Sequence, residues 1–329
     1  MGKTNWWFTS IGMEACESIS RRATRSKFAY PSSAVSSKQF STTRPMDYTH
    51  LAMKFKNAPL IELVAEFRWI PNTGAVAAAV QQGAGNLAPM PIADTVPSEA
   101  FFSKFSTGIA RHGYAWAERL IPMGWPFPNF MPVFRFRHPD IQGKNEPTLF
   151  QIGSGIFSAH ALPPYETWEQ FKPVIEKGLE VLLSSRSVEE QPRPFNSITL
   201  RYIDRFTGKF TGTLSSREFI EQVLNVRLQL PSVLIGETND EAKINPSMLL
   251  RIPLKSGLLM NLNINAGVNV AAEGFLMDTI VTTNSATDAS VDSAMKVLGQ
   301  AHDSIRRVFV GLTTPISDKL EPEQNNVTV

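Results

Sequence analysis

A strand-like segment in the middle of the chain carries two arginines and an aspartate. In SITLRYIDRF, residues 197–206, apolar residues fall mostly on even positions, whereas Arg201 and Arg205 fall on odd positions with Asp204 between them. Because successive side chains of a β-strand point to opposite faces, the two guanidinium groups are expected on one face. Arginine binds carboxylate and phosphate groups bidentately, so its counterpart could be a substrate anion, a partner protein or a carboxylate of this chain.

An earlier segment offers such carboxylates. Glu62, Glu66 and Arg68 share one parity within residues 59–71, which otherwise have the apolar character of a strand. Glu62 and Glu66 would lie about 13 Å apart along a strand, too far to share a proton or to act as a retaining glycosidase pair. We therefore expect an internal layer of ion pairs between neighbouring strands, with an anion-binding clamp as the alternative.

The candidate residues for a ligand or partner site come from these two strands and from one histidine near the C-terminus. They are Glu62, Glu66, Arg68, Arg201, Asp204, Arg205 and His302. His302 beside Asp303 could form a base with an orienting carboxylate. Adjacent helix residues point apart, however, which favours a partly buried histidine.

The sequence lacks the motifs of common catalytic and cofactor sites. Its five histidines show no metal-binding spacing, it has no GxSxG or phosphate-binding loop, and its one cysteine is Cys16 in the N-terminal segment. GAGNLA at 83–88 resembles a dinucleotide-binding loop, but Pro89 and Pro91 follow where a helix would have to open. We expect no catalytic residue, no metal and no cofactor.

The composition is typical of a globular protein, and the charge does not favour nucleic-acid binding. Hydrophobic residues make up 43% and charged residues 19% of the 329 residues. Residues 1–45 hold seven basic and two acidic residues, so the net charge of +2 leaves −3 for residues 46–329. A body without a basic excess argues against nucleic-acid binding, although Arg135, Arg137 and Lys144 could form a local patch.

The first 45 residues are rich in Ser, Thr and Arg and show no sustained apolar period. We interpret them as sequence upstream of a natural start at Met46, with a disordered extension or a transit-like presequence as alternatives. No run of 18 apolar residues occurs, so no membrane span is expected. The single cysteine excludes an internal disulfide, and we expect a cytoplasmic location.

The order of the expected elements is that of an α+β protein. Runs of consecutive strands with helices between them favour a mostly antiparallel sheet with packed helices. Residues 46–195 and 196–329 each have the elements of a small sheet with two helices, which raises the alternative of two similar α+β halves. Strands are expected at 59–71, 132–139, 148–162, 197–206, 247–255, 257–268 and 274–283, and helices at 98–122, 165–185, 215–224 and 288–313.

Four motifs in this order resemble a sporadically distributed family of bacterial proteins without an established activity. The motifs are a P-L-x-E first strand, a Y-x-x-W-x-x-F helix entry, an L-R-Y-I-[ND]-R strand and a terminal H-D-x-I helix. The resemblance covers about residues 50–314. The matching residues are Pro59, Leu60 and Glu62; Tyr165, Trp168 and Phe171; Leu200, Arg201, Tyr202, Ile203, Asp204 and Arg205; and His302, Asp303 and Ile305.

The resemblance implies a cytoplasmic prokaryotic protein whose patchy distribution would suit a role in defence or in conflict between cells. It carries over no catalytic residues, and residues 1–45 lie outside it. Together with the lack of catalytic motifs, this favours a non-enzymatic module that binds a protein partner, within an accessory defence or toxin–immunity system. The alternative is an enzyme or binder of an anionic small ligand on the Arg201, Arg205, Glu62 and Glu66 face. Homo-oligomerisation is a further option.

Overall fold

The computed structural model describes residues 54–71, 99–139 except Pro126, 147–266 except Glu166 and Glu189, and 274–323. The expectations for residues 1–45 and for the GAGNLA segment lie outside the described residues.

The strands of the described chain follow the alternating patterns of the sequence. Seven expected strand segments are confirmed, and they contain β2, β4 to β6 and β7 to β10. The strands are β1 (Lys54–Phe55), β2 (Leu60–Arg68), β3 (Trp116–Arg119), β4 (Phe134–Arg137), β5 (Thr148–Gly153), β6 (Ile156–Ala161), β7 (Ser197–Phe206), β8 (Met248–Pro253), β9 (Leu259–Ala266), β10 (Phe275–Thr282) and β11 (Pro322–Glu323).

Three long helices and several short ones complete the fold. Thr167 caps α3, because its side-chain oxygen accepts a hydrogen bond from the Gln170 backbone N–H. The helices are α2 (Glu99–Ala110), α3 (Trp168–Ser185), α4 (Gly208–Thr211), α5 (Ser216–Glu218), the π-helix η2 (Phe219–Val223), α6 (Ser232–Gly236), the 3-10 helix η3 (Glu241–Lys243), α7 (Val291–Leu312), the 3-10 helix η4 (Thr314–Ile316) and α8 (Ser317–Leu320).

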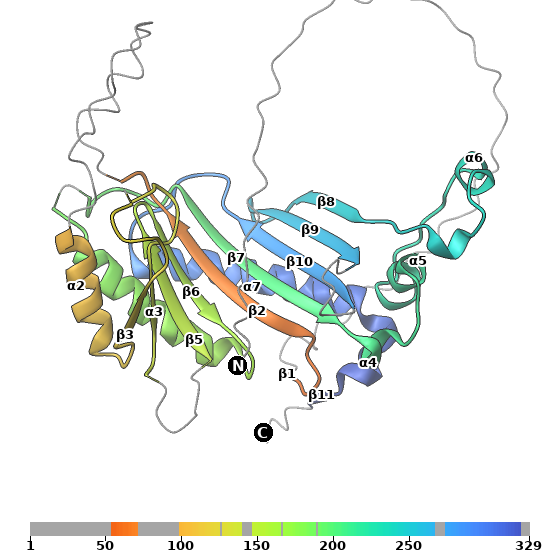
Figure 1. Ribbon diagram of the computed structural model, residues 1–329, viewed down its shortest axis with the longest axis horizontal. Helices are drawn as coiled ribbons and strands as arrows, with labels where there is room; N and C mark the ends of the chain where they lie inside the picture. Colours follow the sequence, from red (N-terminus) through yellow and green to blue (C-terminus); the bar gives the residue numbers. More distant parts are fainter. Residues whose placement is uncertain are drawn as a thin grey trace, which may run out of the picture. The chain divides into compact units, whose positions relative to one another are not determined.

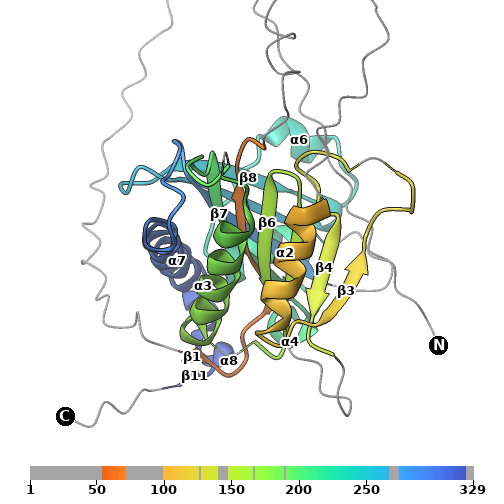
Figure 2. The ribbon, with the colours of Figure 1, turned by 90° about the vertical axis from the view of Figure 1, so that its left-hand side faces the viewer.

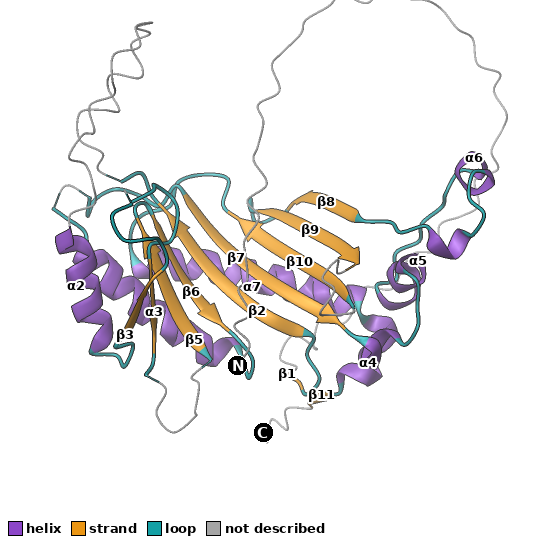
Figure 3. Ribbon diagram, in the orientation of Figure 1, coloured by secondary structure: helices purple, strands orange, loops and turns teal. Residues whose placement is uncertain are grey.

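Nine strands form one antiparallel sheet in the order β3-β4-β5-β6-β2-β7-β10-β9-β8, while β1 pairs separately with β11 (Figures 1 and 3). The architecture is therefore α+β, as the sequence predicts. Strands from residues 60–161 and from residues 197–282 lie in the same sheet. They meet where β2 pairs with β7, with Ala65 opposite Leu200.

The connectivity is the same on both sides of this central pair. On one side β2 neighbours β6, followed outward by β5 and β4; on the other side β7 neighbours β10, followed by β9 and β8. Each set ends in a long helix, α3 after β6 and α7 after β10. The two halves thus repeat one topology, and β3 is an additional edge strand in the first half.

α2, α3 and α7 cover one face of the sheet (Figure 2). Apolar residues of α3 recur at helical spacing, as Phe171, Ile175 and Leu179 show, and they are buried against inward-pointing strand residues such as Leu63 and Leu200. Both halves contribute to this one hydrophobic core. We call this side the helix-covered face and the other side the open face.

One of the expected helices was too long. The expected helix at 98–122 ends at Ala110, and residues 116–119 form the edge strand β3 instead. Gly113 lies between them with φ of 96°, a left-handed conformation that a helix cannot continue through. Further along the chain, α8 is followed by β11, which pairs with β1.

No helix among the described residues is long and apolar enough to cross a membrane.

The packing of α3 on the sheet can be tested at Gly178. A Cβ atom there would lie 2.5 Å from Phe150 Cε1 and 2.8 Å from Phe157 Cζ, both buried rings. We expect Gly178→Ala to lower the free energy of unfolding, because overpacking costs about 1–3 kcal/mol and exceeds the helix-propensity gain of about 0.5–1 kcal/mol. Urea unfolding of both proteins measures the change.

The matched control is Gly299→Ala in α7, where nothing lies within 4 Å of the added Cβ. This variant should raise the free energy of unfolding by about 0.5–1 kcal/mol. Equal stabilisation by both substitutions would contradict the close packing at Gly178.

Candidate functional site

The open face of the sheet carries most of the charged residues that the sequence singles out. Side chains alternate between the two faces along each strand, so the apolar residues of β2, β7 and β10 lie under the helices. The residues between them point to the open face. The polar side chains brought together on the open face are Glu62, Glu66 and Arg68 of β2, Ser158 and His160 of β6, Arg201 and Arg205 of β7, and Asp278 of β10.

Arg201 is bound by a carboxylate of the neighbouring strand. Its Nε and Nη2 atoms donate hydrogen bonds of 2.8 and 2.7 Å to the two carboxylate oxygens of Asp278. Burial alone would lower the pKa of Arg201, but these hydrogen bonds and the nearby charges of Asp278, Glu62 and Glu66 together raise it. The expected cross-strand ion pair therefore forms at this arginine, with a partner that the sequence did not single out.

Glu62 belongs to a chain of three hydrogen-bonded side chains. His160 Nδ1 lies 2.8 Å from Glu62 Oε1, and His160 Nε2 lies 2.8 Å from Ser158 Oγ. This order of atoms matches that of Ser-His-Glu groups that activate a serine nucleophile.

Access and charge oppose such a role at Ser158. The residue is only 3% exposed, which leaves no room for an acyl group to approach its hydroxyl oxygen in this conformation. Glu66 is its direct partner on β2, and a carboxylate there would repel a developing oxyanion. The three groups instead satisfy one another's hydrogen bonds in a buried part of the sheet.

The two other arginines among the candidate residues, Arg68 and Arg205, differ in their pairing. Arg68 Nε donates a 2.6 Å hydrogen bond to Glu66 Oε1 of its own strand. The Arg205 Nε atom is buried and has no hydrogen-bond partner among the described residues. Arg135, from the basic patch considered in the sequence, binds Glu118 at 3.2 Å, and Lys144 lies outside the described residues.

Asp204 and His302 lie on the helix-covered face, away from the arginines. Asp204 is 4% exposed, and burial, with the charge of Asp278 as a second cause, raises its pKa to about 8. The ring of His302 stacks on Trp168 at 4.6 Å, and its Nδ1 lies 2.7 Å from the Tyr202 hydroxyl. Burial and the charge of Arg306 lower the pKa of His302 to about 4. The candidate residues thus form two groups separated by the sheet.

Five large apolar side chains are exposed near one end of the sheet, and the sequence did not single them out. Their exposed fractions range from 41% to 84%. We call them the apolar loop cluster: Ile70 after β2, and Met123, Trp125, Phe130 and Met131 in the β3–β4 loop.

The backbone of the apolar loop cluster is held by hydrogen bonds at Phe130 and at Ile70. The Phe130 N–H donates to Ser154 O at 2.6 Å, and Ser154 Oγ donates to Asn129 Oδ1 at 2.7 Å. On the other side, the Ile70 N–H donates to Asn196 Oδ1 at 2.9 Å. Phe130 has φ of 60°, a conformation that is strained for a residue with a side chain and is held by these contacts.

Among the described residues, no group of three or more His, Cys, Asp or Glu side chains is arranged to hold a metal ion. Comparison with models of known protein families gives no match, and no curated protein sequence matches significantly. The family resemblance of the four motifs therefore stays a prediction.

A double-mutant cycle can measure the strength of the Arg201–Asp278 pair. We expect Arg201→Met to lower the free energy of unfolding by about 1.5–3 kcal/mol, because it removes two charge-assisted hydrogen bonds at a half-buried position. Asp278→Leu in the Arg201→Met background should then cost much less than it does alone.

The control cycle uses Arg68→Met and Glu66→Leu, a pair with one hydrogen bond and a 40% exposed arginine side chain. Its coupling should stay below about 1 kcal/mol. A coupling at Arg201–Asp278 no larger than this would mean that the bidentate pair adds little to stability.

The buried carboxyl of Asp204 predicts a pH dependence of stability. Its pKa is about 8 in the folded chain and about 4 when unfolded, so between these values the folded state holds the extra proton. Stability should therefore fall as the pH rises from 6.5 to 8, by at most about 1.4 kcal/mol per pH unit. His302 does not interfere, because its depressed pKa costs stability only below about pH 6.5.

Asp204→Asn should flatten this slope, and Asp318→Asn at an exposed carboxyl should leave it unchanged. Guanidinium unfolding at four pH values between 6.5 and 8 measures both. An identical slope in the wild type and in Asp204→Asn would show that Asp204 ionises normally in the folded chain.

Proposed function

We propose that this protein is a binding module that recognises another protein through the apolar loop cluster. The observation that carries the proposal is the exposure of a tryptophan, a phenylalanine, an isoleucine and two methionines on an anchored loop region. Trp, Phe and Met are enriched in the centres of protein interfaces, and exposed groups of such side chains mark interaction sites.

The fixed backbone of the cluster supports this role. A loop whose backbone is already held by hydrogen bonds loses little backbone entropy when a partner binds, so more of the burial energy remains for affinity. Polar side chains such as Arg135 and Glu118 lie on the adjoining strands, and they would form the hydrated rim that surrounds an apolar interface centre.

The alternative is an anionic ligand on the open face, bound by Arg201 and Arg205. A ligand at Arg201 would have to replace two short hydrogen bonds to Asp278 and would leave that carboxylate unpaired. The proposal of a protein partner requires no such exchange. The resemblance to the sporadically distributed bacterial family adds a proposed context, an accessory defence or toxin–immunity system, in which the partner would be a protein.

The test compares proteins retained by the tagged full chain and by the double variant Trp125→Ser/Phe130→Ser, from lysate of cells that carry the gene. We expect a stoichiometric partner to be retained by the wild type and reduced at least tenfold by the variant, because central aromatic side chains supply much of the binding energy. Quantitative mass spectrometry gives the ratio.

The control is Val233→Ser/Leu234→Ser, which removes two exposed apolar side chains from α6. It should retain the partner as the wild type does. If all three proteins retain the partner equally, the interface lies elsewhere. If the wild-type chain is a monomer and retains no protein, the proposal is contradicted.

A further inference from the structure

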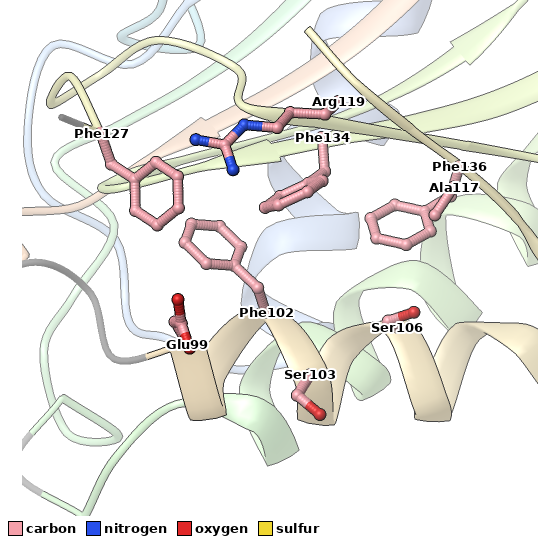
Figure 4. A pocket seen from close by; sticks show the side chains of 9 residues that line it. All are labelled: Glu99, Phe102, Ser103, Ser106, Ala117, Arg119, Phe127, Phe134 and Phe136. Atoms are coloured by element: carbon pink, nitrogen blue, oxygen red, sulfur yellow. The ribbon is translucent and has the colours of Figure 1, made fainter. Parts of the chain in front are cut away.

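A second feature of the first half is a pocket between α2 and the strands β3 and β4, on the helix-covered side of the sheet edge (Figure 4). Its volume is about 260 Å³. Phenylalanine rings and one guanidinium group dominate its lining. The lining residues are Glu99, Phe102, Ser103, Ser106, Ala117, Arg119, Phe127, Phe134 and Phe136.

The apolar wall of the pocket is a packed set of aromatic rings. The Phe102 ring centroid lies 5.2 Å from that of Phe127 and 5.1 Å from that of Phe134, in tilted and edge-on arrangements. Such a wall favours a flat apolar body, because a further ring can adopt the same edge-to-face geometry.

Arg119 brings to this wall a cation that has no oxygen partner in the part of the chain that the structure describes. Its guanidinium carbon lies 5.2 Å from the Phe127 ring centroid, and its Nε is buried without a hydrogen bond among the described residues. The one acceptor near its Nη1 is the Met123 sulfur at 3.8 Å, which is a weak acceptor. A cation–π contact does not satisfy N–H donors, so the guanidinium retains unmet capacity for an anion.

Two other arginines show how such a group can be paired with a carboxylate in this chain. Arg135 on the adjacent strand binds Glu118, and Arg201 binds Asp278. Glu99 lines the same pocket as Arg119 but forms no ion pair with it (Figure 4). The single positive charge and the carboxylate at the rim together favour a ligand with one negative charge over a dianion such as a phosphate ester.

We propose that this pocket binds a small monocarboxylate with an apolar, ring-containing body. The carboxylate accepts hydrogen bonds from Arg119, and the body lies against Phe102, Phe127 and Phe134. The volume lies just below the range of pockets for drug-sized ligands, which limits the occupant to a smaller molecule. This inference goes beyond the proposed protein binding and does not depend on it.

The test is calorimetric titration of the full chain with 3-phenylpropionate, and with 3-phenylpropan-1-ol as the uncharged analogue. We expect the acid to bind at least tenfold more tightly than the alcohol, since only the acid can pair with the guanidinium. Arg119→Gln should weaken binding of the acid at least tenfold and change binding of the alcohol little.

Two further variants keep the outcome unambiguous. Arg111→Gln removes an exposed arginine just beyond α2 and should leave both affinities unchanged. Ser106→Leu fills the pocket from α2 while Arg119 stays in place, and it should abolish binding of both compounds. Circular dichroism checks that each variant is folded.

The proposal is overturned if 3-phenylpropionate does not bind the wild type at millimolar concentration. It is also overturned if the acid binds Arg119→Gln as tightly as the wild type, or if Ser106→Leu binds it unchanged.

Discussion

The antiparallel pairing of β2 with β7 is the constraint on which the other features depend. It joins the two halves of the chain into one sheet and sets which side chains face the helices. A slip of one residue in either strand would turn its buried side chains, Leu63 of β2 or Leu200 of β7, to the open face and bring its charged groups under the helices. The hydrophobic core and the charged face are thus two consequences of one register.

The charges on the open face make that register specific. Arg201 reaches Asp278 on one side of the central pair, and Glu62 reaches His160 on the other. A shifted strand would lose these partners and leave half-buried charges unpaired, at a cost greater than the gain from the pairs themselves. These side-chain pairs therefore act mainly by disfavouring other strand registers. We interpret the polar face first as a structural feature.

Alternation in the sequence was sufficient to predict the faces of Arg201 and Glu62, because a period of two is a local property. The same alternation puts Asp204 on the even, apolar positions. We had grouped it with Arg201 and Arg205 because of its charge. The partners Asp278 and His160 could not be predicted, since the sequence does not state which strands are neighbours or in which register. The apolar loop cluster and the Arg119 pocket depend on the path of the β3–β4 connection, and a helix was expected where β3 begins. Only Gly113 signalled that change.

The repeated connectivity on the two sides of β2 and β7 has a consequence for the history of the chain. The halves meet where β2 pairs with β7, so one half alone would have β2 or β7 as an unpaired edge strand. Two copies of such a half could restore the sheet about a dyad between the two strands. The present arrangement is what the fusion of an ancestral homodimer would leave. The first half has β3 and its loop in addition, and Val133 and Phe136 bury this region in the core that the two halves share.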